Sequence, residues 1–361
     1  MQSVDFTLKN IAYFLICAIG TGWILFIGDF IIVPMLYGLF FAILLRPLVN
    51  RYQKMLKRRV PSLVLAFLTI LISFIVIAGL ISYQLFEIIN SLPAIGENVE
   101  TGIYKVIEEF NNMLPSVITL QPEELVSQFG SLLSTPLSLL GKGVVLSSNS
   151  IVEVLIAFIY GFFILLYSKS IKNFVIYQYK RTHRKDVKQV LFKIQETIQQ
   201  FVSGMLTVII LLSVINSLCL YLIGIKYAVF WGVLGGLLAI IPYVGTVLGG
   251  LLPLLYAIST TGTYWQPLAI IAAYSLIQQL EGNFITPKVI GDKVNVNPLV
   301  AILSLILFGS LWGVGGVILA LPLISIVRII ISEFEATQPI SLLMRADIRS
   351  LKDKFKELAH Q

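Results

Sequence analysis

Hydrophobic positions along the chain gather in long runs that are separated by short polar segments. Two of these runs, residues 231–253 and 298–322, are broken near the middle by residues that a continuous helix avoids. Interrupted helices are tolerated in lipid where protein or a water-filled cavity covers the freed backbone groups. A pair of them in the second half of a chain points to the binding site of a secondary transporter. The breaking residues are Pro242 and Gly245 in the first run, and Gly309, Gly313, Gly315 and Gly316 in the second.

Six further apolar runs are predicted to be membrane-spanning helices, because about 20 apolar residues are needed to cross the hydrocarbon core of a bilayer. Composition supports this environment: 57% of the 361 residues are hydrophobic, 12% are charged and the mean hydropathy is +0.90. A soluble protein of this length could not bury so much apolar surface. We therefore expect an all-α polytopic membrane protein. The six runs are residues 11–27, 30–45, 62–83, 151–168, 201–223 and 267–280.

Basic residues are concentrated in short segments beside the apolar runs, and the positive-inside rule converts this pattern into an orientation. Residues 46–61 hold six Lys and Arg and no acidic residue, and residues 169–193 hold eight against Asp186. Both segments are expected in the cytoplasm. The formal net charge of +7 thus reflects membrane orientation. No nucleic-acid partner is expected, since no recognised nucleic-acid-binding module accompanies the basic segments.

The polar insertion over residues 84–150 has the opposite charge balance and is expected outside the cell. It contains seven glutamates against Lys105 and Lys142. A helical period within it predicts an amphipathic helix. We interpret the insertion as a small external helical cap, and a substrate gate and a partner-docking surface stay open as alternatives. The periodic apolar residues are Ile103, Val106, Ile107, Phe110 and Leu114.

Two membrane topologies agree with this pattern, and both place the two termini in the cytoplasm. The chain has eight full spans if the interrupted runs cross completely, or six full spans if both are re-entrant hairpins. Lys288 and Lys293 favour a cytoplasmic location for residues 281–297, which only the hairpin topology allows. We therefore expect two hairpins. The expected parts are spans 1 to 3 (residues 1–83), the external insertion (84–150), span 4 with the basic segment (151–200), the transport core (201–330) and a cytoplasmic tail (331–361).

A polar cluster at the end of the run 267–280 supplies the main candidate site. A carboxylate at the centre of a bilayer costs about 2.5 to 3.5 kcal/mol on insertion scales, so such a group is usually paired or functional. Glu281 is the candidate for taking up a proton or a cation, while the neighbouring amides hydrogen-bond a polar substrate. The alternative is that Glu281 lies at the headgroup level. The cluster comprises Gln278, Gln279, Glu281, Asn283, Thr286 and Pro287.

The two interruptions supply the remaining candidates. Freed carbonyls before Pro242 and helix N-termini after it can meet ions or hydroxyl groups, although a proline kink packed against glycines is the alternative. Trp312 is expected either to close the second tip or to anchor at the membrane interface. Asn216, inside the run 201–223, is interpreted as a polar contact between helices. The first tip comprises Pro242, Tyr243, Gly245 and Thr246, and the hairpin or gating set comprises Gly309, Trp312, Gly313, Gly315, Gly316 and Pro322.

Signatures of an enzyme are missing from the sequence. Both histidines, His183 and His360, lie in predicted cytoplasmic segments, so no histidine-based metal site is expected at membrane depth. The stretch Gly141-Lys142-Gly143 lacks the spacing of a phosphate-binding loop. We expect no enzymatic activity, no metal and no cofactor, with coupling to a proton or Na⁺ left open.

Four motifs resemble the bacterial AI-2E family of transporters, named for export of the furanone signal autoinducer-2. They are IIPYVGTVLGGLLP (240–253), QQLEGNFITPKVIGDKV (278–294), NPLVAILSL (297–305) and GVGGVILALPL (313–323). The resemblance implies a multi-pass protein of the bacterial inner membrane, a homo-oligomer and a link to quorum sensing. Some relatives resemble sodium or lithium to proton antiporters. Asn297 stands where the resemblance leads us to expect a histidine, which removes a titratable group.

Three functions follow as hypotheses. The first is a secondary transporter that exports a small polar solute, with the two interrupted runs and Glu281 forming the site. The second is a sodium or lithium to proton antiporter in which Glu281 is the exchange carboxylate. The third is a membrane scaffold that binds a partner through the external insertion. The expected partners are the lipid bilayer, a small polar solute or monovalent cation, and further copies of the chain.

The topology is testable at Asp292, which lies in the connector between the two interrupted runs. In the hairpin topology, Asp292→Cys reacts with an impermeant thiol reagent only from the cytoplasmic side. The measurement is labelling of right-side-out and inverted vesicles, in a background with Cys17 and Cys219 replaced by serine. Labelling from the outer side would restore the topology with eight spans.

Overall fold

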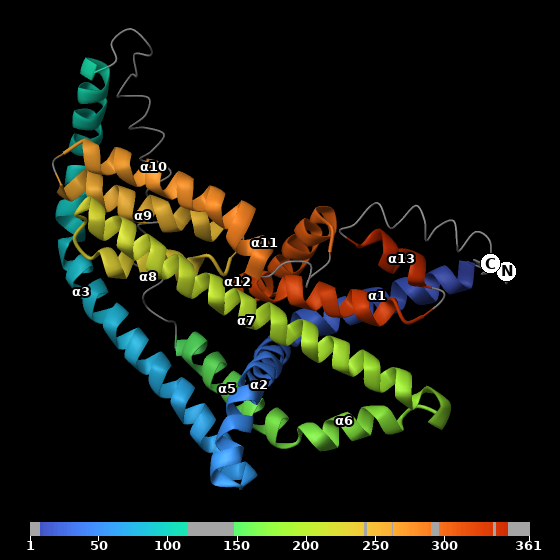
Figure 1. The fold of residues 1–361 in the computed structure, drawn as a ribbon. Helices are drawn as coiled ribbons and strands as arrows, with labels where there is room; N and C mark the ends of the chain where they lie inside the picture. Colours follow the sequence, from blue (N-terminus) through green and yellow to red (C-terminus); the bar gives the residue numbers. More distant parts are fainter. Residues whose placement is uncertain are drawn as a thin grey trace. The chain divides into compact units, whose positions relative to one another are not determined.

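The structure, a computed structural model, describes residues 8–113, 148–241, 244–261, 263–289, 296–334 and 337–345. Within these ranges the chain forms helices and no strand, as expected for an all-α protein (Figure 1). The helices are α1 (Leu8–Ile27), α2 (Asp29–Leu56), α3 (Arg59–Met113), α5 (Ser148–Leu166), α6 (Ser168–Tyr177), α7 (Arg184–Ile223), α8 (Ala228–Leu238), α9 (Val244–Thr260), α10 (Trp265–Leu280), α11 (Thr286–Val289), α12 (Pro298–Ile331) and α13 (Gln338–Leu343), with a 3-10 turn η1 (Arg181–His183) and a π-helical turn η2 (Glu281–Ile285).

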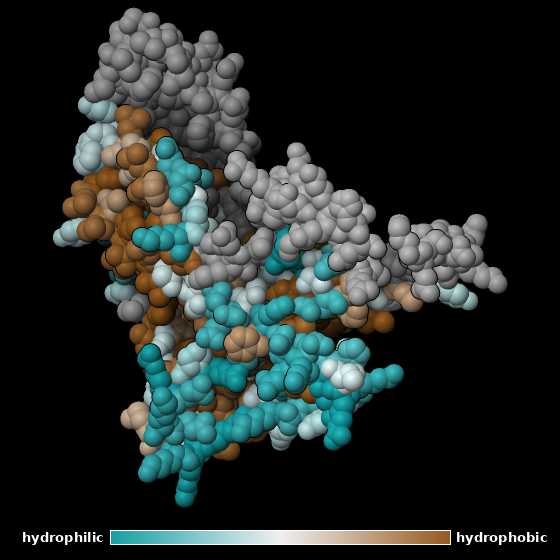
Figure 2. All heavy atoms as spheres, turned by 45° about the vertical axis from the view of Figure 1, so that its right-hand side comes forward, coloured by the Kyte–Doolittle hydropathy of each residue, from teal (hydrophilic) through white to brown (hydrophobic). Residues whose placement is uncertain are grey.

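By length and composition, four of the described helices could cross a membrane: α2, the part of α3 up to Ile88, α7 and α12, although α12 is broken at Trp312 and Gly313. Helices α5 and α6, which are bent by 67° where they meet, form a fifth candidate if the pair counts as one span. Many large apolar side chains along these helices are exposed, and Figure 2 shows them as broad brown areas. Such a surface requires an apolar solvent, so the chain is a multi-pass membrane protein.

Two predicted boundaries differ from the structure. The predicted loop over residues 46–61 is mostly helical, because α2 continues to Leu56 and α3 begins at Arg59. Buried Leu45 and Val49, four residues apart, carry the apolar stripe of α2 into this basic segment. The third span also has no end at residue 83, since α3 continues to Met113, in the predicted external insertion. Residue 114 and the rest of the insertion up to residue 147 lie outside the described residues.

The chain folds into two compact units whose sequences interleave. Unit 1 comprises Met1–Val64, Ile151–Gln199 and Val294–Gln361, and unit 2 comprises Leu65–Ser150 and Gln200–Lys293. Each unit contains one of the two interrupted runs.

In unit 2, helices α8 and α9 form an antiparallel hairpin. A Cβ on Gly249 would stand 3.0 Å from the Cα of Gly235, and a Cβ on Gly245 would overlap the carbonyl oxygen of Leu238. These pairs bring the two arms into backbone contact, which only glycine permits. The chain therefore reverses between Leu238 and Val244, as predicted for an interrupted run. At 1.5 Å per residue, the 11 residues of α8 span roughly 17 Å, too little to cross a bilayer alone.

In unit 1, helix α12 is a second hairpin. Its helical backbone is broken at Trp312 (φ −131°, ψ 15°) and Gly313 (φ 60°, ψ −142°). A Cβ on Gly316 would overlap the carbonyl oxygen of Phe308, although residues eight apart in a straight helix are separated by about 12 Å. The predicted interruption at this run is thus a reversal of the chain.

The tip of the second hairpin is fastened by two helices of the same unit. The indole N–H of Trp312 donates to the carbonyl oxygen of Leu25 at 2.9 Å, in the last turn of α1, where carbonyls lack helical partners. The hydroxyl of Tyr37 in α2 donates to the carbonyl oxygen of Gly315 at 3.1 Å. Trp312 therefore lies at the tip, as the first of its two predicted roles requires.

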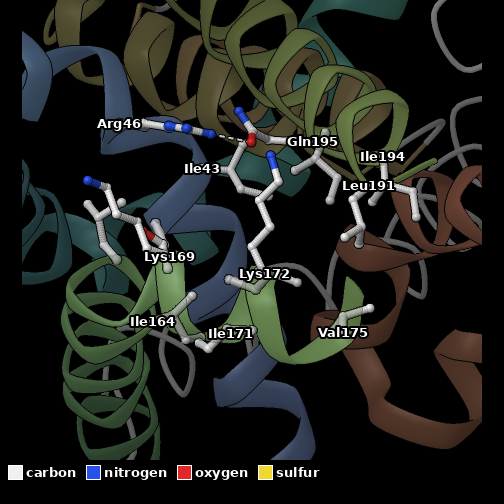
Figure 3. A pocket seen from close by; sticks show the side chains of 15 residues that line it. Ile43, Arg46, Ile164, Lys169, Ile171, Lys172, Val175, Leu191, Ile194 and Gln195 are labelled. Atoms are coloured by element: carbon white, nitrogen blue, oxygen red, sulfur yellow. Dashed lines mark hydrogen bonds between the residues drawn. The ribbon is translucent and has the colours of Figure 1, made fainter. Parts of the chain in front are cut away.

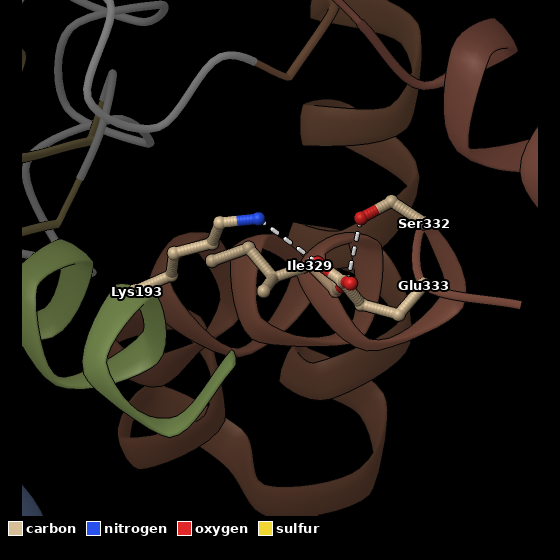
Figure 4. Close-up of polar contacts among 4 residues, drawn as sticks. All are labelled: Lys193, Ile329, Ser332 and Glu333. Atoms are coloured by element: carbon tan, nitrogen blue, oxygen red, sulfur yellow. Dashed lines mark hydrogen bonds and ion pairs between the residues drawn. The ribbon is translucent and has the colours of Figure 1, made fainter. Parts of the chain in front are cut away.

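The ends of α12 are tied down by polar contacts. At its start Asn297 is the N-cap: its side-chain oxygen accepts from the backbone N–H of Val300 at 2.9 Å, and its amide N–H donates to the carbonyl of Leu343 at 2.6 Å. After its last residue, Glu333 pairs with Lys193 of α7 at 3.0 Å (Figure 4). The amide that replaces the expected histidine thus has a capping role.

We predict that Gly313→Ala destabilises the protein through its backbone. Gly313 has positive φ and nothing lies within 4 Å of an added Cβ, so the strain of the conformation is the whole effect. Residues held in such regions cost about 1–3 kcal/mol. Thermal unfolding in detergent, followed by circular dichroism, should show a lower Tm. The control is Gly79→Ala in α3, which also has free space but a helical backbone; an equal change in the two variants would contradict the proposed strain.

Candidate functional site

The candidate site in unit 2 is built on one face of α10. Tyr274, Gln278 and Glu281 follow one another at i, i+4 and i+7, so their side chains stack along the same side of the helix. Gly250 of α9 packs directly against this face, because an added Cβ would stand 2.9 Å from the ring of Tyr274. The small residues of the first hairpin therefore let α10 approach closely.

A small cavity of about 20 Å³ lies where this face meets α7 and the first hairpin. A cavity needs roughly 10–15 Å³ to accept one water molecule, so this one has room for a single water-sized group. In Figure 1, α9 and α10 run side by side above α7 in this unit, and α8 lies on the other side of α7 in this view. The lining residues are Leu212 and Asn216 of α7, Gly235, Ala239 and Gly249 of the hairpin, and Tyr274, Ile277, Gln278 and Glu281.

Two polar groups of the cavity wall have no hydrogen-bond partner among the described residues. Asn216 is 4% exposed and its Oδ1 is unpartnered, and so is the hydroxyl oxygen of Tyr274. Buried polar atoms in folded proteins are nearly always paired, because an unpaired one costs about 1–3 kcal/mol. Two of them facing one small cavity indicate a polar occupant, and the half-buried carboxyl of Glu281 lines the same space.

Glu281 occupies an unusual backbone position. It begins the π-helical turn η2, in which the backbone N–H of Thr286 donates to the carbonyl oxygen of Glu281, five residues back. Single π-turns inserted in a helix occur frequently at functional sites, because they re-aim the side chains around them. The predicted polar connector after residue 280 is therefore helical at its start, through η2 and α11.

The structure brings only some of the predicted cluster together. Gln278 and Glu281 line the cavity, and Thr286 is half-buried outside the set of lining residues. Gln279, Asn283 and Pro287 are exposed and do not line it.

The structure places the predicted residues of the first tip and of the hairpin or gating set in different surroundings. Pro242 and Tyr243 lie outside the described residues, and so does the side chain of Thr246. Gly245 is in contact with the preceding arm and has a packing role. The hairpin or gating set, Gly309, Trp312, Gly313, Gly315, Gly316 and Pro322, belongs to unit 1.

Sequence reasoning missed Tyr274 and left Asn216 out of the candidate site. Its interpretation as a polar contact between helices stays a prediction: the side-chain nitrogen lies beside Gly235 of α8, and Oδ1 has no partner in the described part of the chain. A signal for Tyr274 exists in the sequence, since it precedes Gln278 by four residues and Glu281 by seven. The proximity of Asn216 to this face depends on how α7 packs, which periodicity does not report.

The described residues form membrane-length helices, two helical hairpins at the interrupted runs and a polar cavity beside one hairpin. Together these features define a polytopic membrane protein of the transporter class. Residues 13–336 match the family described as AI-2E family transporter. The chain therefore belongs to the AI-2E family, and the resemblance of its four motifs is confirmed.

Relatives from bacteria align along most of the chain. YhhT of Escherichia coli (strain K12) is 26% identical over 320 residues, which cover 87% of this chain and 88% of YhhT. The AI-2 transport protein TqsA of the same strain is 27% identical over 322 residues, which cover 87% and 89%. YueF of Bacillus subtilis (strain 168) is 23% identical over 314 residues, which cover 82% of each chain.

We predict different effects for two partly buried tyrosines, Tyr274 and Tyr37. Tyr274→Phe removes a hydroxyl that has no partner among the described residues, so the Tm is expected to stay the same or rise. Tyr37→Phe removes the hydroxyl that donates to the carbonyl oxygen of Gly315, so the free energy of unfolding is expected to fall by about 0.5–1.5 kcal/mol. Thermal unfolding of both variants in detergent makes the comparison. A loss in Tyr274→Phe as large as that in Tyr37→Phe would show that its hydroxyl is already bonded by a permanently held group.

Proposed function

We propose that this protein is a secondary transporter that exports a small polar solute, and that the cavity beside Glu281 is part of its polar pathway. The observation that carries the proposal is a pair of buried groups without a partner among the described residues, Asn216 Oδ1 and the Tyr274 hydroxyl, in residues that line the same cavity as the half-buried Glu281. Polar groups inside a membrane protein are costly and mark substrate or ion pathways. The similarity to TqsA, an AI-2 transport protein, adds autoinducer-2 as a candidate solute.

The proposed topology has six full spans and two re-entrant hairpins, with both termini in the cytoplasm. Its support is the reversal of the chain in both interrupted runs and the shortness of α8. A helix that dips in and returns can present its tip to a polar pathway without crossing. Location in a bacterial inner membrane and assembly into a homo-oligomer belong to the same proposal.

A sodium or lithium to proton antiporter is the second candidate, and the size of the cavity favours it. A space of about 20 Å³ suits a water-sized group, whereas a furanone requires a larger opening. In this version Glu281 exchanges a proton for a cation, and Asn216 and Tyr274 supply neutral oxygen ligands. Oxygen ligands of this kind suit hard monovalent cations.

Transport by protein reconstituted in liposomes separates the candidates. If the protein is an antiporter, added sodium releases protons from the lumen, and Glu281→Gln lowers that rate by about tenfold or more, because the neutral amide cannot exchange a proton. If it is an exporter, autoinducer-2 accumulates in inverted proteoliposomes without sodium, and Asn216→Leu lowers the rate. Glu153→Gln is the control, since this exposed glutamate of α5 lies outside the cavity. Neither activity, together with a stable partner on the external insertion, would support a scaffold instead.

A further inference from the structure

Unit 1 contains a larger pocket that the transport proposal does not use. Its volume is about 280 Å³, and it lies among α2, α5, α6 and the beginning of α7 (Figure 3). All of its lining residues belong to unit 1. They are Leu39, Ala42, Ile43, Arg46, Ile164, Leu165, Ser168, Lys169, Ile171, Lys172, Val175, Leu191, Ile194, Gln195 and Ile198.

The lining has two chemically distinct parts. Aliphatic side chains from all four helices form the wall, among them Ile43, Ile164 and Ile194. Three cations, Arg46 and the two lysines of α6, Lys169 and Lys172, contribute the charge. An apolar space with cations at its edge matches an amphiphile with an anionic head and a hydrocarbon chain.

These cations lack a compensating acid. Arg46 donates to the side-chain oxygen of Gln195, a neutral partner, and Figure 3 shows Lys172 extending from α6 toward that pair. Among the described residues, no carboxylate lies within ion-pair distance of Arg46, Lys169 or Lys172. Lys193, outside the pocket, is paired with Glu333. Within the described part of the chain, the pocket therefore holds positive charge without a compensating carboxylate.

The position of the two lysines is fixed by the bend between α5 and α6. The guanidinium of Arg59 donates to the carbonyl oxygen of Leu165 and to the hydroxyl of Ser168, each at 2.9 Å. These bonds satisfy the end of α5 and hold the 67° turn from which α6 departs. Lys169 and Lys172 are three residues apart, so they project from neighbouring positions on one face of α6.

The predicted location of the pocket is consistent with contact with the membrane surface. Both segments that carry these cations are predicted to be cytoplasmic by the positive-inside rule. Exposed Phe174 and Tyr177 of α6 are the kind of residues that sit at a membrane interface. Basic pockets between membrane helices on this side bind the head groups of anionic lipids.

We propose that this pocket is a binding site for an acidic phospholipid. Its phosphate lies between Arg46, Lys169 and Lys172, where the guanidinium and the ammonium groups donate to its oxygens. An acyl chain follows the aliphatic wall past Ile43 and Ile164. Soluble phosphate esters carry the same phosphate group, but they have no acyl chain to bury against the apolar wall.

The test is lipid binding by the full-length protein in a neutral detergent, measured by native mass spectrometry with phosphatidylglycerol, and with phosphatidylcholine as the zwitterionic comparison. Phosphatidylglycerol is expected to bind at least about tenfold more tightly. The double variant Lys169→Gln with Lys172→Gln is expected to lose this preference. The matched control is Lys185→Gln with Lys188→Gln, which removes the same charge from exposed lysines of α7 outside the pocket. An equal loss in both double variants would overturn the site in favour of general surface attraction.

Two further experiments test whether the ligand is a lipid or a soluble anion. Ile171→Ser places a hydroxyl in the lining and should weaken phosphatidylglycerol, whereas Phe174→Ser, an exposed residue of the same helix outside the lining, should not. Glycerol 3-phosphate and inorganic phosphate should fail to displace the lipid at equal concentration. Displacement by either of them, or equal binding of phosphatidylcholine, would overturn the proposal.

Discussion

The structure depends on one constraint, which is that every backbone N–H and C=O inside a bilayer needs a hydrogen-bond partner from the protein. Both interrupted runs break this rule locally and both repair it by folding back on themselves. Gly245 lies against the carbonyl of Leu238 and Gly316 against the carbonyl of Phe308, so each second arm covers the end of the first. A side chain at either glycine would push the arms apart and uncover the break, which is why small residues gather after each interruption.

Side chains obey the same constraint, and this makes the exceptions informative. Two polar side chains at the tip of the second hairpin are paired: the indole of Trp312 bonds α1, and the hydroxyl of Tyr37 bonds the backbone of Gly315. In unit 2 the arrangement is different, because Asn216 and Tyr274 present unpartnered oxygens to a cavity with room for one small group. Among the described residues, the oxygens of Asn216 and Tyr274 are thus the unpaired polar atoms of the cavity wall, and the transport proposal rests on them.

Much of this arrangement follows from local sequence rules, and the remainder depends on packing. The breaks were predictable because proline and glycine act on the backbone where they stand, as at Gly313 with its positive φ. The shared face of Gln278 and Glu281 follows from helical periodicity. The position of Asn216 beside that face was not predictable, since it depends on how α7 packs against α10. The length of α2 was also missed, because a buried stripe overrides the charged residues that suggested a loop.

The two units differ in their content of basic residues. The basic segments 46–59 and 169–193 both lie in unit 1, whereas the half-buried Glu281 and its cavity lie in unit 2. Cations near anionic lipid contribute about 1 kcal/mol each, so a membrane surface is expected to attract unit 1 more strongly than unit 2. Unit 2 carries few such charges between residues 200 and 293 and is less restrained by the surface.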